Sequence, residues 1–309
     1  MGKSDNKVTV AYIVGAGRSG STVLDTILGN HSEVESVGEL CNLVRSAWLG
    51  PDYCACGARG SECPFWSEVR LDWIRRTGAS DLKEFKKLED VFERSRFFSR
   101  LLRGSFARKA EFQVYSNYAV SLFQAISEVS GKRIIVDSSK IPARAFALSR
   151  MPGVDLKLIH LVRDPRGLAR SLQKAFRKNL RSGVARDMRP FPVWRVPLPW
   201  IRVNVCSSWL VKRVGPGRGL TIRYEDLMAD HRGTLEKLGK LMGLGYEPVI
   251  RTIDSGGSMK VGHTIAGNRV RMAGSIRLQA DVEWVQKLSD REKALVRTLA
   301  GWHMRKYGY

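Results

Sequence analysis

Short apolar runs alternate with apolar stripes at helical spacing along most of the chain, and this pattern is typical of an α/β fold. The first run, residues 8–14, is rich in β-branched residues, as expected of a strand buried in a parallel sheet. The stripe that follows, residues 23–28, stops at Gly29-Asn30, which is a helix-end signal. The chain therefore opens with a strand, a glycine-rich turn and a helix.

Four later segments repeat the strand pattern, and helical stripes separate them. We expect strands at residues 31–37, 133–137, 154–163 and 220–224. We expect helices within an insertion over residues 81–130, after Ile141-Pro142, from Pro165, over 203–214, from Glu225 to about Gly243, and over 281–306. The apolar positions of the insertion include Phe97, Phe98, Leu101 and Leu102. Those of the last helix are Trp284, Val285, Leu288, Leu295 and Trp302. The pattern predicts a single three-layer αβα domain over residues 1–309, with a central parallel sheet of about five strands and a helical insertion.

The glycine-rich turn between the first strand and helix has the geometry of an anion-binding loop, because backbone N–H groups and the helix dipole both favour phosphate there. Three interpretations of the turn compete. It matches the dinucleotide fingerprint G-x-G-x-x-G from Gly15, with Glu39 where an acidic ribose partner would lie. It is also nearly a Walker A loop, but Ser21 stands where the phosphate-binding lysine should be, so a triphosphate with its magnesium would be poorly held.

The third interpretation takes Gly17-Arg18-Ser19-Gly20-Ser21-Thr22 as a P-loop-like cradle for a single 5′-phosphate. Arg18 would supply the positive charge, and the three hydroxyl groups would add hydrogen-bond donors. Hydroxyl residues after the last glycine favour phosphate binding over the close helix packing of a dinucleotide fold. A plain turn that binds nothing is the remaining alternative.

Polar residues follow two other predicted strands where they end. Glu39 comes directly after the second strand, and in a parallel sheet it would face the same crevice as the glycine turn. It is a candidate general base, with a ribose ligand and a helix-capping residue as alternatives. Lys140 follows Asp137-Ser138-Ser139 at the end of the next strand and is a candidate to stabilise a transferring anion, against a solvated lysine. We expect Asp137 to hold its loop together rather than bind a metal.

A second candidate phosphate site lies where the strand over 154–163 ends. Arg163 leaves this strand, Asp164 and Pro165 suit the start of a helix, and Ser171 lies two turns along it, on a face that can look back at Arg163. Two separate phosphate sites predict a nucleotide phosphorylated at two positions. The alternative for Arg163 is an ion pair with neighbours of Asp164.

The charge balance restricts the partners without choosing among them. The chain has 52 Lys and Arg residues against 30 Asp and Glu residues, a formal net charge of +22. Such a basic protein suits an anionic cofactor, an anionic acceptor, nucleic acid or an acidic membrane surface. No apolar run is long enough to span a membrane, and residues 1–7 lack a signal-peptide core, so we expect a soluble, cytoplasmic protein.

Three cysteines, Cys54, Cys56 and Cys63, lie in a loop over residues 50–66, with Cys41 a short way upstream. Four thiolates could bind zinc, but the spacing is not a common knuckle and no histidine is near in the sequence. Free thiols, a disulfide and a metal all stay open. The loop, together with a basic, proline-rich segment over residues 180–200 that carries Trp194 and Trp200, could border an acceptor site, although an ordinary surface loop is nearly as good an interpretation of 180–200.

Taken together, these motifs resemble the sulfotransferases that use 3′-phosphoadenosine 5′-phosphosulfate (PAPS). The G-x-G-R-S-G-S-T loop is similar to that family's 5′-phosphosulfate loop, and L-V-R-D-P-R-G-L-A-R-S is similar to its 3′-phosphate element. Gly38-Glu39 resembles the catalytic glutamate position of the tyrosylprotein-type and some bacterial members, residues 136–140 resemble a bacterial segment, and residues 262–271 resemble a late nucleotide-binding loop.

The resemblance implies roles for the candidate residues in sulfuryl transfer from PAPS to an acceptor hydroxyl. Glu39 would act as general base, and Arg18, with Lys140 in support, would stabilise the transferring group without a metal. Gly17, Arg18, Ser19, Gly20, Ser21 and Thr22 would hold the 5′-phosphate, and Arg163, Ser171, Asn268 and Arg269 the 3′-phosphate. The cytosolic branch uses a lysine in the first loop and a histidine base, so its small-molecule acceptors do not carry over, and a glycan, a lipid, a peptide and a metabolite all stay open.

Two alternatives from other classes are kept. An NAD(P)-dependent oxidoreductase would use the GxGxxG loop but leaves Arg163, Ser171 and Asn268 without roles. A basic nucleic-acid-binding protein would account for the charge, but the sequence contains no recognised nucleic-acid module and no stripe of interleaved aromatic and basic residues.

Overall fold

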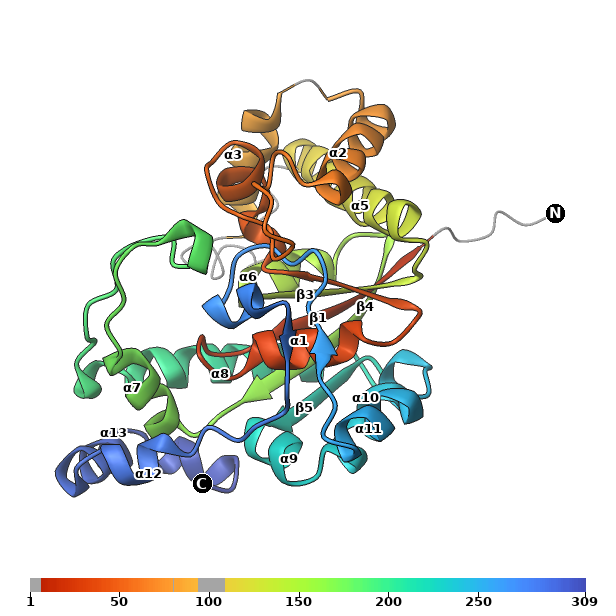
Figure 1. Ribbon diagram of the computed structural model, residues 1–309. Helices are drawn as coiled ribbons and strands as arrows, with labels where there is room; N and C mark the ends of the chain where they lie inside the picture. The colour runs from red at the N-terminus through yellow and green to blue at the C-terminus, as the bar shows by residue number, and fades with distance from the viewer. Residues whose placement is uncertain (1–6, 80, 94–108) are drawn as a thin grey trace.

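The computed structural model describes residues 7–79, 81–93 and 109–309, and a five-stranded parallel sheet runs through its centre (Figure 1). The strands lie in the order β2-β3-β1-β4-β5. Their bounds are Val8–Val14 for β1, Val34–Gly38 for β2, Ile134–Lys140 for β3, Val154–Val162 for β4 and Gly219–Arg223 for β5. The predicted α/β fold and the five-stranded parallel sheet are therefore confirmed.

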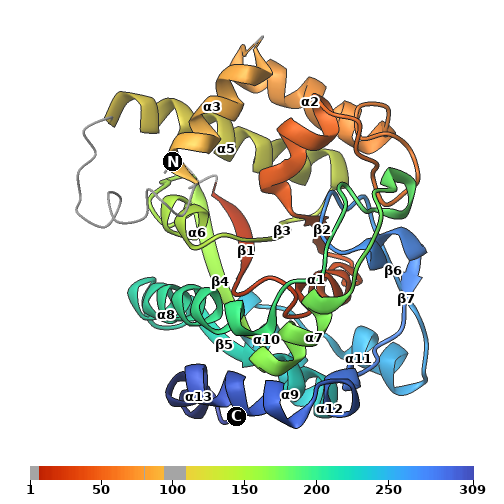
Figure 2. The same cartoon turned by 90° about the vertical axis from the view of Figure 1, so that its left-hand side faces the viewer.

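Helices cover both faces of the sheet, which gives the predicted three layers. On one face, β1 packs Val10, Tyr12 and Val14 against α2 (Pro64–Thr77), α3 (Leu82–Phe92), α5 (Lys109–Ser130) and α6 (Pro142–Leu148). On the other face, Ala11 and Ile13 pack against α1 (Ser21–Gly29), α9 (Tyr224–Ala229), α10 (His231–Met242) and α11 (Glu247–Asp254). The two groups of helices lie on opposite sides of the sheet in Figure 2. Successive β1 side chains alternate between two apolar layers, which is why the run is apolar throughout.

A third apolar cluster lies beside the main layers. It joins α7 (Pro165–Gln173), α8 (Pro197–Arg213) and α13 (Asp290–Lys306), with the short α12 (Glu283–Lys287) next to α7. Two short strands, β6 (Met259–Lys260) and β7 (Ser275–Ile276), form a separate antiparallel pair. None of the helices described here is long and apolar enough to cross a membrane.

Several sequence predictions of helices were wrong in their bounds. Helix α2 was not predicted, because its first turn carries Pro64-Phe65-Trp66 of the cysteine loop. Helix α8 begins at Pro197, so the last part of segment 180–200 is helical. The helix predicted from Glu225 is two helices, since Asp230 caps α10 by accepting a hydrogen bond from the N–H of Gly233. The predicted residues Phe97, Phe98, Leu101 and Leu102 lie outside the described residues.

The last helix also differs from its prediction. It is interrupted at Ser289, where a capping box with Glu292 starts α13. The buried residues of α13 are Val296, Ala300 and Met304, whereas Leu295 and Trp302 are 38% and 77% exposed. The interruption resets the helical phase, so only the first part of the predicted stripe is confirmed: Leu288 is buried and Trp284 packs against the third apolar cluster, whereas Val285, Leu295 and Trp302 are exposed.

The strand order places the ends of β1, β3 and β4 side by side at one edge of the sheet. Val14 of β1 pairs with Lys140 of β3 and with His160 of β4. The connection after β1 leads to one side of the sheet, while β4 lies on the other side of β1. This reversal is the point at which open α/β sheets form ligand-binding crevices. The extent of the domain over the whole of 1–309 stays a prediction.

Candidate active site

The loop after β1 forms a tight turn that opens into α1. Gly20 precedes the helix with φ of 90°, and a Cβ there would lie 2.5 Å from the ring of Tyr224, so only glycine fits without displacement. Gly17 is exposed, and a Cβ on it would meet no atom within 4 Å among the described residues. The helix begins without a side-chain cap, which leaves the first N–H groups of α1 available to an anion.

Arg18 links the two predicted phosphate sites. Its Nε donates a hydrogen bond of 2.9 Å to Oγ of Ser171 on α7, and its backbone carbonyl accepts one of 3.1 Å from Nη1 of Arg163. Arg18 has φ of 69°, an unfavourable conformation for a residue with a side chain. Strained residues of this kind cluster at functional sites because the surrounding structure must hold them there. The structure therefore brings the glycine loop, Arg163 and Ser171 together.

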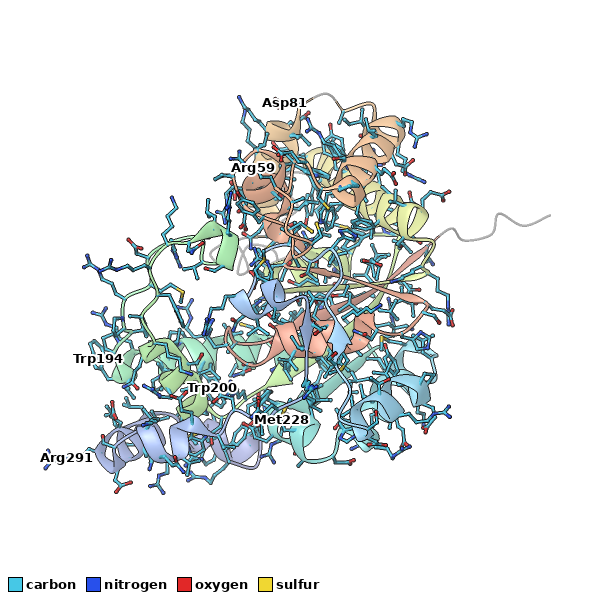
Figure 3. All side chains as sticks on the ribbon, in the orientation of Figure 1. Arg59, Asp81, Trp194, Trp200, Met228 and Arg291 are labelled. Atoms are coloured by element: carbon cyan, nitrogen blue, oxygen red, sulfur yellow. The ribbon has the colours of Figure 1, made fainter. Side chains whose placement is uncertain are left out.

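Arg163 is buried and already well partnered. Its Nη2 lies 3.0 Å from both the backbone carbonyl and a carboxylate oxygen of Asp281, and its guanidinium lies 4.3 Å from the ring centre of Tyr224. Trp200 of α8 donates from Nε1 to the carbonyl of Arg163 at 2.9 Å. Arg163 does form an ion pair, but its partner is Asp281, which is distant in sequence, and not a neighbour of Asp164 as the alternative proposed. Trp200 is a buried support of Arg163, whereas Trp194 is 58% exposed (both labelled in Figure 3).

Glu39 and Lys140 form a direct ion pair at the ends of β2 and β3. Asn42 donates a second hydrogen bond, of 3.1 Å, to the Glu39 carboxylate. Glu39 makes no side-chain cap to the helical turn that follows it, so its capping alternative was wrong. Lys140 belongs to β3 and is not a solvated lysine, since it also donates to the carbonyl of Ser138 at 2.9 Å. Its φ of 68° is a second strained conformation at the site.

The late loop closes over the glycine loop. The backbone N–H of Asn268 donates to Oγ1 of Thr22 at 3.3 Å, and a Cβ on Gly267 would lie 3.5 Å from the Glu39 carboxylate. Ala266 has φ of 54°, the third non-glycine residue with a positive φ among those described. Residues from the two ends of the chain thus meet beside Glu39.

A cavity of about 410 Å³ lies between these elements. Its lining includes Arg18, Glu39, Asn268 and Arg269, whereas Lys140, Arg163 and Ser171 are not among the residues that line it. Residues 183–186 and Met188 also line it, so the first part of the predicted loop over 180–200 borders this cavity. Residues 176–188, which overlap the start of that loop, fold back on themselves, and Gly183 packs against Arg269.

The charges around the cavity suit an anion. Burial and the nearby guanidinium groups of Arg163 and Arg269 lower the pKa of Arg18, so three positive charges repel one another there. Ser19 is buried, and its Oγ has no hydrogen-bond partner within the described part of the chain. An anionic group with several acceptor oxygens would relieve the repulsion and supply the missing acceptor. The residues present therefore fit a phosphate-bearing ligand.

Sequence reasoning missed several supporting residues. Asn42 and Arg45 form a chain of hydrogen bonds to Glu39, with Arg45 Nη2 donating to Asn42 Oδ1 at 2.8 Å. Tyr224 supports both Gly20 and Arg163, and its hydroxyl oxygen accepts from the N–H of Asp281 at 3.0 Å. Only the position of Tyr224 directly after a strand could have indicated it. Asp137 pairs with the buried Arg144 at 2.9 Å, as expected of a residue that holds its loop together.

The cysteine loop has an unexpected neighbour. Cys54, Cys56 and Cys63 lie beside His263, and the four ligand atoms are all within 4.8 Å of one another. The sequence places no histidine near these cysteines, but the fold brings His263 next to them, so the expectation that no histidine is near was wrong. Cys41 is not part of this group. Its backbone N–H donates a hydrogen bond of 3.1 Å to Oγ of Ser139. The cysteines are free thiols in this structure.

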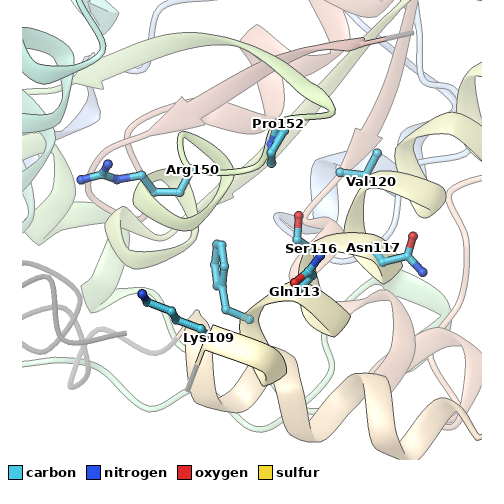
Figure 4. A pocket seen from close by; sticks show the side chains of 8 residues that line it. Lys109, Gln113, Ser116, Asn117, Val120, Arg150 and Pro152 are labelled. Carbon is cyan, nitrogen blue, oxygen red and sulfur yellow. The ribbon is translucent and has the colours of Figure 1, made fainter. Parts of the chain in front are cut away.

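A second cavity, of about 580 Å³, lies at the opposite end of the sheet (Figure 4). It is formed by the first half of α5 together with Arg150 and Pro152, which precede β4. None of the predicted site residues lines it. Because ligands of parallel sheets bind beyond the carboxyl ends of the strands, we place the candidate site at the first cavity.

A comparison with protein-family models identifies the family of this chain. A family model described as "Sulfotransferase family" matches residues 62–248, which is more than half of the chain. A search of curated proteins found no match. The matched range contains Lys140, Arg163 and Ser171 but not the glycine loop, Glu39 or the late loop.

Solved structures similar to this chain include three sulfotransferases. The sulfotransferase domain of the olefin synthase from Synechococcus PCC 7002 is 20% identical, with 95% of this chain and 94% of that chain covered and a TM-score of 0.47. The sulfotransferase domain of the curacin biosynthetic pathway is 18% identical, with 95% of this chain and 97% of that chain covered and a TM-score of 0.48. Sulfotransferase STF9 from Mycobacterium avium is 13% identical, with 99% of this chain and 78% of that chain covered and a TM-score of 0.46. With TM-scores below 0.5, these likenesses carry no argument about the site. The family match over more than half of the chain is decisive: this protein belongs to the sulfotransferase family and is a sulfotransferase enzyme.

Proposed function

We propose that this enzyme transfers a sulfuryl group from PAPS to the hydroxyl group of an acceptor. The observation that carries the proposal is that Arg18 and Glu39 line one cavity while Arg18 is hydrogen-bonded to Ser171 of a separate element. A candidate base therefore lies beside a cationic site assembled from the ends of two strands. Membership of the sulfotransferase family leaves the oxidoreductase and nucleic-acid-binding alternatives without support.

We assign the nucleotide to the cationic side of the cavity. Gly17, Ser19, Gly20, Ser21 and Thr22 would hold the 5′-phosphate through backbone N–H groups and hydroxyls, as the uncapped start of α1 favours. Arg163, Ser171, Asn268 and Arg269 would hold the 3′-phosphate. When bound, PAPS supplies an activated sulfuryl group and departs as 3′,5′-adenosine bisphosphate. No catalytic metal is part of the proposal, because the cationic side chains supply the positive charge.

We assign proton transfer to Glu39. Its carboxylate is oriented by Lys140 and Asn42 and faces the cavity, so it would accept the proton from the acceptor hydroxyl as that oxygen attacks. Arg18 and Lys140 would stabilise the negative charge that develops during transfer. Sulfuryl transfer resembles phosphoryl transfer in depending mostly on positioning and cationic stabilisation, and this distribution of groups suits it.

We place the acceptor on the outer side of the cavity, against residues 183–188. Arg45 and Arg186 also line the cavity, so the acceptor side carries positive charge as well. A hydroxyl acceptor that bears an anionic group would be favoured there. Whether that acceptor is a glycan, a lipid, a peptide or a metabolite is the question for a screen.

A transfer assay tests this proposal. Purified enzyme would be incubated with sulfur-labelled PAPS and a panel of hydroxyl compounds from these four classes, with neutral and anionic members of each. We expect label in at least one acceptor together with stoichiometric release of 3′,5′-adenosine bisphosphate. Failure of the nucleotide to bind at all, or transfer that persists fully in Glu39→Gln, would contradict the proposal.

A further inference from the structure

The cluster of Cys54, Cys56, Cys63 and His263 has the composition of a metal site outside the candidate active site. The four residues come from two segments about 200 positions apart, yet their ligand atoms lie within 4.8 Å of one another. Soft sulfur ligands with one imidazole favour zinc over magnesium or calcium. Ligands for a tetrahedral ion must also stand at particular distances from one another.

The distances in the cluster agree with that requirement. In a tetrahedral zinc site, zinc–ligand bonds of usual length place two sulfurs about 3.8 Å apart and a sulfur and a nitrogen about 3.5 Å apart. Here the sulfurs of Cys56 and Cys63 are 3.6 Å apart. Nδ1 of His263 lies 3.8 Å from the sulfur of Cys54 and 3.3 Å from that of Cys63. A disulfide between Cys56 and Cys63 would need about 2.05 Å and would use only two of the four groups.

The backbone around the cluster is already fixed. Gly57 has φ of 92° and closes the turn that holds Cys54 and Cys56 next to each other, with its N–H donating to the carbonyl of Cys54 at 3.0 Å. The N–H of Ala55 donates to the carbonyl of Thr264 at 3.0 Å, which joins the turn to the segment carrying His263. Ligands held in this way need little rearrangement to bind an ion.

Aromatic residues at the start of α2 orient the histidine. The ring of Phe65 stacks on His263 with centroids 4.9 Å apart, and Nε1 of Trp66 donates to the carbonyl of His263 at 2.7 Å. Contacts that fix the ring of a metal-binding histidine are typical of the surroundings of such sites. Cys54 and Cys63 are buried, while Cys56 is exposed and gives an ion a route of entry.

We propose that Cys54, Cys56, Cys63 and His263 bind a structural zinc ion. Four protein ligands would leave no position for water, which is the arrangement of structural rather than catalytic zinc. The ion would connect the loop before α2 to residues 262–268. That segment continues to the candidate active site, since Ile265 exchanges backbone hydrogen bonds with Val37 and Glu39 at 3.0 and 2.8 Å. The zinc ion would therefore hold in place the strand-like segment beside Glu39.

Metal analysis of the intact enzyme tests the proposal without measuring activity. The wild type, Cys56→Ser and Cys206→Ser would be purified with a reductant and zinc, dialysed against a weak chelator, and measured for metal content. Cys56 is the exposed ligand, so its substitution is the least disturbing to the core, and Cys206 on α8 is a matched control outside the cluster. We expect about one zinc ion per chain in the wild type and in Cys206→Ser, and its loss from Cys56→Ser.

Cobalt substitution gives a readout that does not depend on how stably a variant folds. Wild type loaded with Co²⁺ should show sulfur-to-cobalt charge transfer and the intense visible bands of tetrahedral coordination, and chelation should increase hydrogen exchange in residues 262–271. A wild type that takes up no zinc, one that holds iron instead, or a Cys56→Ser variant that keeps its zinc would each overturn the proposal.

Discussion

Replacing Arg18 by methionine should separate ligand binding from folding. Arg18 lines the cavity, near the guanidinium groups of Arg163 and Arg269. Burial lowers the pKa of Arg18 most, and the two neighbouring positive charges lower it further. In the protein without nucleotide the repulsion is unfavourable, and the hydrogen bond to Ser171 and the negative charges of Asp281 and Glu39 offset part of it. A net hydrogen bond contributes about 1 kcal/mol, so its loss and the relief of repulsion should nearly cancel.

The nucleotide-bound state should respond differently. A hydrogen bond from a charged donor to a phosphate contributes about 1.5–3 kcal/mol, so Arg18→Met should weaken the binding of 3′,5′-adenosine bisphosphate by about 10- to 150-fold. The free energy of unfolding of the protein without nucleotide should change by less than about 1 kcal/mol, a shift in Tm of a few degrees at most. Methionine keeps an unbranched side chain at this positive φ, so the substitution removes the guanidinium charge and its hydrogen bond without changing the demand on the backbone.

Calorimetric titration and thermal denaturation of the same samples would measure both quantities. Arg291→Met, an exposed arginine of α13 that does not line the cavity, is the control (labelled in Figure 3). A variant with unchanged affinity for the bisphosphate would refute the role of Arg18. A large fall in Tm would show instead that Arg18 holds the fold together.

Three further predictions concern the base, the glycine loop and the pH dependence of stability. Glu39→Gln should lower kcat with an identified acceptor by about 100- to 10,000-fold while calorimetry finds the bisphosphate affinity unchanged, and a kcat near the wild-type value would mean that another group takes the proton. Gly17→Ala should keep the wild-type Tm but weaken bisphosphate binding, because its Cβ would enter the open space in which the phosphate is proposed to bind. Gly20→Ala should lower the free energy of unfolding by about 1–3 kcal/mol, because its Cβ would meet Tyr224 at a residue with a positive φ. Equal Tm values for the two variants would contradict this difference. Burial lowers the pKa of His160 to about 4, so the unfolded chain takes up this proton first as pH falls, and stability should drop by about 3 kcal/mol between about pH 6.5 and 4. Urea unfolding at several pH values should show that the free energy of unfolding falls less steeply with decreasing pH in His160→Gln than in the wild type. An identical pH dependence in the two proteins would exclude His160 as the source.

The sheet and the two cationic loops could be predicted from the sequence because each depends on neighbouring residues. β1 and β4 are buried on both faces, so their apolar runs are continuous and easy to recognise. Glycines, hydroxyls and Arg18 follow β1 within a few positions, and Arg163 follows β4 directly. Carboxyl ends of parallel strands meet at one edge, so these loops were expected to be neighbours.

The contacts that complete the site could not be predicted, because they join residues far apart in the chain. Nothing near Arg163 indicates Asp281 as its partner, and nothing near Cys63 indicates His263. The ion pair of Glu39 with Lys140 depends on the placement of β3 beside β2, which the order of strands decides. The interruption at Ser289 is different, since Ser289 and Glu292 spell a capping box that the sequence does contain.

Calorimetric titration with 3′,5′-adenosine bisphosphate, run beside 5′-AMP, NADPH and Mg-ATP, would show whether the protein holds a nucleotide with two separate phosphates. The two cationic loops meet through Arg18 and Ser171, so we predict tight binding of the bisphosphate, much weaker binding of 5′-AMP, and a smaller difference between the two in Ser171→Ala. Equal affinities for the bisphosphate and 5′-AMP would contradict a second phosphate site. Binding of NADPH in place of the bisphosphate would contradict the assignment of the nucleotide.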